Sequence, residues 1–164
     1  MGAIGYISVL DGQKDNIRIE ISLREPLLTA TVSGKARTLM IDPVSNASLI
    51  APVSVSCISR IEALAEKFRA ALTRREVAIR DFYDLDYLMR QYAIRSQDLE
   101  LRTLVKSKIH VPGNGPIDVG ESRLAELRNQ MDGRLKPVLR EKDFSEFSLA
   151  RAYETVTHMA RIVA

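Results

Sequence analysis

The sequence predicts an α+β fold in which a small antiparallel or mixed β-sheet is followed by a helical bundle. Residues 1–58 consist of short apolar stretches between turn-forming residues and show no long helical periodicity. From Ser59 onward, apolar residues instead recur at the three- and four-residue spacing of amphipathic helices. We therefore divide the chain into a β-rich region, residues 1–58, and a helical region, residues 59–164.

The composition is that of an ordered domain with no membrane segment. Of the 164 residues, 46% are apolar and 27% are charged, which is enough apolar material for a sizeable core. No apolar run approaches the roughly 18 residues of a membrane-spanning helix. The single cysteine, Cys57, excludes an intrachain disulfide, and we expect a cytoplasmic protein. The net charge of +3 comes mostly from arginine and weakly favours a phosphate-bearing partner.

The first two strands are expected at residues 4–10 and 17–23. The intervening DGQKDN is rich in turn residues, so the two strands should form an antiparallel hairpin. In the second strand, isoleucine and leucine alternate with polar residues, which predicts one buried face and places Glu20 on the other. Glu20 either pairs with a neighbouring base or serves as a rigidly held metal ligand. Further short strands are expected at residues 28–32, 37–41 and 53–57.

The helical region begins with a helical hairpin at residues 59–89. Ser59 followed by Glu62 three residues later is a capping-box signature for the start of the first helix. Apolar positions then follow one face of each of the two helices. Later helices are expected at residues 96–108, 121–135 and 145–163, for a total of about five. The segment HVPGNGPIDV, with two prolines and two glycines, is expected to be a loop.

Charged residues are dense on the polar faces of this hairpin. On spacing alone two interpretations stay open. In the first the charges are solvated, and Arg80 and Asp84 form an ordinary ion pair four residues apart, worth a few tenths of a kcal/mol. In the second the hairpin is a site that handles a polyanion, such as a phosphate-bearing substrate.

The order of the residues favours the second interpretation. The run Glu66-Lys67-Phe68-Arg69-Ala70-Ala71-Leu72, then Arg80-Asp81-Phe82-Tyr83-Asp84-Leu85, preceded by the strand Ile19-Glu20-Ile21, resembles the AbiEii/AbiGii toxin family of nucleotidyltransferase-like proteins. The resemblance covers nearly the whole chain and suits the C-terminal two-thirds of such a protein. It implies a toxin of a toxin–antitoxin (abortive infection) system, which transfers nucleotides from an NTP with Mg²⁺. The implied partners are an antitoxin protein and an acceptor such as tRNA or another RNA.

The resemblance also implies roles for individual residues. Glu20 is the implied catalytic carboxylate and metal ligand, and Lys67 is the implied contact to the nucleotide phosphates. Asp81 is expected to orient that lysine or to bind the nucleotide, with Asp84 and Arg74 also at the nucleotide. In this chemistry two metal ions clamp the attacking and leaving oxygens, while the lysine offsets the developing charge.

Two family motifs have no counterpart ahead of Glu20, namely the Gly-Ser element and the Asp-x-Asp metal pair. Asp84-Leu85-Asp86 matches the Asp-x-Asp motif in sequence, but in mid-helix its two carboxylates point about 200° apart. We therefore expect a truncated nucleotidyltransferase fold that is inactive alone. The alternative is a non-catalytic RNA- or antitoxin-binding remnant, which self-associates as a homo-oligomer through an exposed sheet edge.

Overall fold

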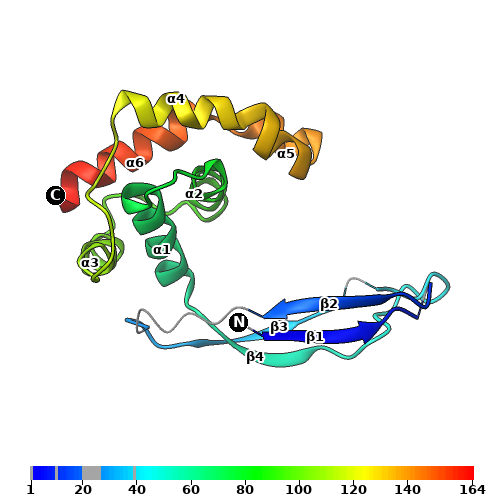
Figure 1. Cartoon of the computed structure of the whole chain (residues 1–164). Coiled ribbons are helices and arrows are strands. Elements are labelled where there is room, and N and C mark those ends of the chain that lie inside the picture. Colours follow the sequence, from blue (N-terminus) through cyan, green and yellow to red (C-terminus); the bar gives the residue numbers. More distant parts are fainter. Residues whose placement is uncertain (1, 10, 20–26, 39) are drawn as a thin grey trace.

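The computed structural model describes residues 2–9, 11–19, 27–38 and 40–164 (Figure 1). Four strands come first: β1 (Gly2–Ile7), β2 (Lys14–Ile19), β3 (Val32–Ala36) and β4 (Val53–Cys57). Six α-helices follow: α1 (Arg60–Thr73), α2 (Ile79–Tyr92), α3 (Leu99–Ile109), α4 (Glu121–Gln130), α5 (Glu141–Glu146) and α6 (Leu149–Val163). This order confirms the α+β class.

The strands form two separate two-stranded antiparallel sheets, β1–β2 and β3–β4, rather than one sheet. The expected first hairpin is present, with Gly2 opposite Ile19 and Ile7 opposite Lys14. Gly12, with φ at +69°, lies in its turn, where glycine adopts a positive φ without strain. The strands predicted at 28–32 and 37–41 are wrong in the described residues, because the strand that forms there is β3, which shares only Val32 with the first prediction.

The prediction that the second strand buries its isoleucine face is wrong for Ile17 and Ile19, and residues 20–23 of that predicted strand lie outside the described residues. All described residues of β2 are exposed, and the Ile17 residue retains 55% of its accessible surface. The cause is that the four strands make their main contacts with one another and not with the helices. In Figure 1 the strands lie on one side of the helical part, while α4 to α6 lie on the other, beyond α1 and α2. Glu20 lies outside the described residues.

The core of the described chain is helical. α1 packs against α2 and α3, and α6 lies across all three. The apolar stripe predicted for the first helical hairpin is buried, and it meets the inner face of α6 in one cluster. The fully buried side chains of this cluster include Leu64, Phe68, Leu72, Phe82, Leu85, Val105, Val156 and Met159. This packing fixes α1 and α2 side by side, which determines what their polar faces can do.

Two of the predicted helices are interrupted. The helix expected over 121–135 ends as α4 at Gln130, and a π-helical turn (Met131–Leu135) and a 3-10 turn (Lys136–Val138) follow. The Gln130 side chain contacts the start of α2. Its Oε1 accepts from the Ile79 N–H, and its Nε2 donates to the Val77 carbonyl. The last helix starts at Leu149, with α5 as a separate piece before it.

The loop between α3 and α4 is present as expected and closes over the end of α1. The Gly115 N–H donates to the Thr73 carbonyl at 3.2 Å, and a Cβ at position 115 would come within 2.8 Å of the same oxygen. Glycine is therefore required for this close approach. None of the described helices combines the length and the apolar character that crossing a membrane requires.

Candidate functional site

The α1–α2 hairpin starts as its sequence indicates. The Ser59 hydroxyl accepts from the Glu62 N–H at 3.2 Å and so caps α1. α2 starts at Ile79 without a side-chain cap, and its first turn carries Asp81. Because the apolar faces of the two helices are buried together, their polar faces lie next to each other at the surface.

Four of the five predicted site residues come together on this surface. Lys67 Nζ lies 2.6 Å from Asp84 Oδ2 and 3.3 Å from Asp81 Oδ1. Arg74 Nη1 lies 2.8 Å from the other Asp81 oxygen, Oδ2. We call Lys67, Arg74, Asp81 and Asp84 the α1–α2 charge cluster. Asp84 thus pairs with Lys67 on the other helix, and the suggested ion pair between Arg80 and Asp84 is not found among the described residues.

Burial differs sharply within the α1–α2 charge cluster. The Asp81 side chain is 6% exposed, whereas that of Lys67 is 36% exposed and that of Arg74 is 49% exposed. One nearly buried carboxylate therefore holds two cations at the surface. A buried carboxylate needs such partners, and in return it restricts where they point.

The lysine of this cluster stays charged. Burial by itself lowers the pKa of Lys67, but its hydrogen bond to Asp84 and the negative charges of Asp84 and Asp81 outweigh that effect. The pKa of Lys67 therefore lies above its ordinary value of about 10.4. The group is a fixed cation and not a proton donor or acceptor near neutral pH.

Hydrogen-bonding capacity is left over on both cations. An ammonium has three N–H donors, of which two reach Asp81 and Asp84. A guanidinium has five donors in a planar fork, and Arg74 uses one nitrogen toward Asp81. The α1–α2 charge cluster can therefore accept a further anion from solvent, and phosphate oxygens suit both donors.

The Asp-x-Asp in α2 does not form a metal site. Asp84 points to Lys67, whereas Asp86 is buried on another side of the helix and accepts from Arg151 at 2.5 and 2.7 Å. The divergence expected from helical geometry is confirmed. Among the described residues no group of three or more histidine, cysteine or acidic side chains could hold a metal ion. The described residues do not fit a divalent metal, and Glu20 lies outside them.

A second ionic cluster was missed by sequence reasoning. The buried Glu62 carboxylate accepts from the Leu28 N–H at 2.8 Å and from the Thr29 N–H and hydroxyl at 2.8 and 2.6 Å. Lys108 of α3 lies 3.0 Å from Glu62 and 2.7 Å from Glu66. These contacts connect the segment before β3 to α1 and α3. A signal existed in the sequence, because Lys108 occupies the next position of the apolar stripe Leu101, Leu104 and Val105.

Comparison with known proteins gives one family. A family model described as "Nucleotidyl transferase AbiEii toxin, Type IV TA system" matches residues 3–156, which is most of the chain. No curated protein and no solved structure matches. The matched range includes both helices of the α1–α2 hairpin and extends into α6.

Proposed function

Because the chain belongs to the AbiEii nucleotidyl transferase toxin family of type IV toxin–antitoxin systems, we propose that its α1–α2 charge cluster binds the phosphates of a nucleoside triphosphate. Membership of the family implies a nucleotidyltransferase toxin with a nucleotide substrate and an antitoxin partner. One observation carries the proposal: the buried Asp81 carboxylate contacts both Lys67 and Arg74, and both side chains remain partly exposed with N–H donors to spare.

Each residue then has a distinct role. Lys67 and Arg74 contact phosphate oxygens of the bound nucleotide and offset their negative charge. Asp81 is a positioning residue, since its burial leaves it to act through the two cations. Asp84 holds Lys67 from the solvent side and is the carboxylate that a phosphate group would displace.

The proposed metal is Mg²⁺, since nucleotidyltransferases generally use a divalent cation and phosphate-bound Mg²⁺ needs only one or two carboxylates. Glu20 remains the proposed ligand by resemblance. The described residues do not complete such a site, so we assign no step of the reaction to the metal. An RNA such as tRNA remains the proposed acceptor.

ATP binding tests the proposal. We expect Lys67→Ala to weaken ATP binding at least tenfold, by about 1.4 kcal/mol, because it removes a charge-assisted contact. Isothermal titration calorimetry of the full chain measures this, with Lys106→Ala, an exposed lysine on α3, as the control.

In the same samples we expect little or no transfer of labelled nucleotide to tRNA. Nucleotide transfer at a measurable rate, abolished by Glu20→Ala, would contradict the expectation that the chain is inactive alone.

A second candidate function is a binding module that assembles through its sheets. It is supported by the exposed apolar side chains of β1 and β2 and by sheet edges that no other described strand pairs with. We propose that a second copy of the chain adds its strands to one of these edges. Sedimentation equilibrium is expected to give a dimer that Ile4→Lys weakens, and a strictly monomeric species would rule this assembly out.

A further inference from the structure

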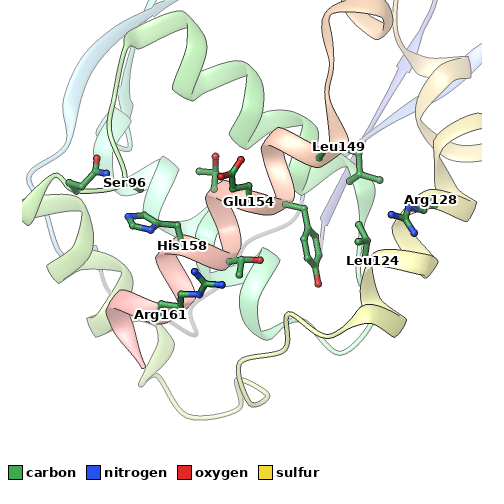
Figure 2. Close-up of a pocket in the computed structure, with 12 residues that line it drawn as sticks. Ser96, Leu124, Arg128, Leu149, Glu154, His158 and Arg161 are labelled. Carbon is green, nitrogen blue, oxygen red and sulfur yellow. The ribbon is translucent and has the colours of Figure 1, made fainter.

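A cavity of about 800 Å³ lies on the outer side of α6, and no residue of the α1–α2 charge cluster lines it. α6 provides one wall, α4 another, and the segment between α2 and α3 closes one end. Figure 2 shows Arg128 and Leu124 entering from α4, His158 and Arg161 from α6, and Ser96 at the far end. Its volume suits a small organic ligand and exceeds what a lone inorganic anion would fill.

The charged residues of this cavity favour an anionic ligand. Arg128 and Arg161 both line it, whereas Glu154 is the only carboxylate that does so. Both arginines are exposed, and neither has an ion-pair partner in the part of the chain that the structure describes, so both are free to contact a ligand. Each lies in the last turn of its helix, where a cation is stabilised by the helix dipole.

Thr157 and His158 both line the cavity, and each has a buried polar atom without a partner among the described residues. His158 Nε2 and Thr157 Oγ1 are buried, and neither makes a hydrogen bond among the described residues. Because both atoms have almost no accessible surface, a ligand in the cavity would reach either one only after its side chain turned. Ser96 and Gln97 add a hydroxyl and an amide to the cavity lining, whereas the Thr155 hydroxyl already donates to the Arg151 carbonyl.

The apolar residues of the cavity suit a flat ring. Leu124 and Leu149 lie near Arg128 in Figure 2, and Tyr153 also lines the cavity. The Tyr153 hydroxyl donates to the Gly120 carbonyl at 2.9 Å, and its ring stacks on Phe82 with centroids 6.0 Å apart. This ring is therefore held rigidly, which lowers the cost of packing a ligand against it.

We propose that this cavity binds a nucleoside phosphate, with phosphate oxygens at Arg128 and Arg161 and the base against the apolar wall. The ligand is either a free nucleotide or the terminal nucleotide of an RNA strand. It is a second site, separate from the α1–α2 charge cluster. It does not depend on the role proposed for Lys67.

Imidazole NMR tests this proposal directly, since the chain has only two histidines, His110 and His158. ATP, a short single-stranded oligoribonucleotide and adenosine are titrated separately into the Lys67→Ala variant of the 164-residue chain, in which the other proposed site is weakened. We expect ATP or the oligoribonucleotide to shift the His158 resonances and to leave those of the exposed His110 in place. The stronger of the two titrants identifies the source of the nucleotide.

Paired variants decide the contribution of the arginines. The double variant Arg128→Ala, Arg161→Ala is expected to weaken the affinity measured from the His158 shifts at least tenfold. Arg37→Ala, which replaces an exposed arginine far along the chain, is expected to leave that affinity unchanged. A His158 resonance that neither titrant moves overturns the proposal. Equal affinity for adenosine and ATP, or an affinity that the double variant retains, overturns it as well.

Discussion

Replacing Lys108 by methionine is expected to lower the free energy of unfolding by about 3 kcal/mol. The Lys108 residue is 1% exposed, and its ammonium lies between the carboxylates of Glu62 and Glu66. Methionine keeps the aliphatic length of the side chain but leaves the buried Glu62 carboxylate without its cation. Removing one partner of a buried ion pair costs more than the pair contributes, because the remaining charge stays desolvated.

Denaturant unfolding monitored by circular dichroism measures this loss, and Lys106→Met is the matched control. Lys106 lies two residues away on the same helix and is exposed, so its replacement should change stability by less than about 0.5 kcal/mol. Equal effects of the two variants would show that the ammonium of Lys108 is not an important structural cation.

Acid is expected to remove about 2–3 kcal/mol of stability through Glu62. Burial alone would raise the pKa of Glu62, but hydrogen bonds from Thr29, from the Leu28 N–H and from Lys108 outweigh it and lower the pKa to about 2. In the unfolded chain the group titrates near 4.3. Its contribution is therefore complete above about pH 4.3 and is lost as the pH falls toward 2.

The Glu62→Gln variant isolates this contribution from that of the other carboxylates. Stability curves of the two proteins should differ by about 2–3 kcal/mol at pH 6 and should converge to within about 1 kcal/mol near pH 2. The reason is that a protonated glutamic acid and glutamine have similar polar groups. Curves that run parallel over this range would contradict the low pKa.

How far the sequence predicts this fold depends on which part of the chain is considered. In the helical region, the spacing of Leu64, Phe68 and Leu72 identifies a buried face, and the structure confirms it, because local periodicity and burial agree there. In the β region the alternation at Ile17 predicts a buried face that is absent. Alternation reports which side chains share a face of a strand, but it cannot say what packs on that face.

The candidate site shows the same division. The family resemblance predicts Lys67 and Asp81 as site residues, and packing of α1 on α2 brings their side chains within hydrogen-bonding distance. Helical geometry also predicts correctly that Asp84 and Asp86 diverge. The Glu62–Lys108 pair could not be predicted as a contact, because the residues lie 46 positions apart and meet only through packing of α1 on α3. Likewise, the arginines of the α6 cavity share no local pattern in the sequence.

The most direct test of the central claim is a double-mutant cycle on ATP affinity with Lys67→Ala, Asp81→Asn and the double variant. If Asp81 acts by positioning Lys67 and Arg74, each single variant weakens binding and the double variant weakens it by less than the sum. Unfolding curves of the same proteins keep stability separate from affinity. ATP affinity that neither single variant changes would show that the α1–α2 charge cluster is only structural, and the account would be wrong.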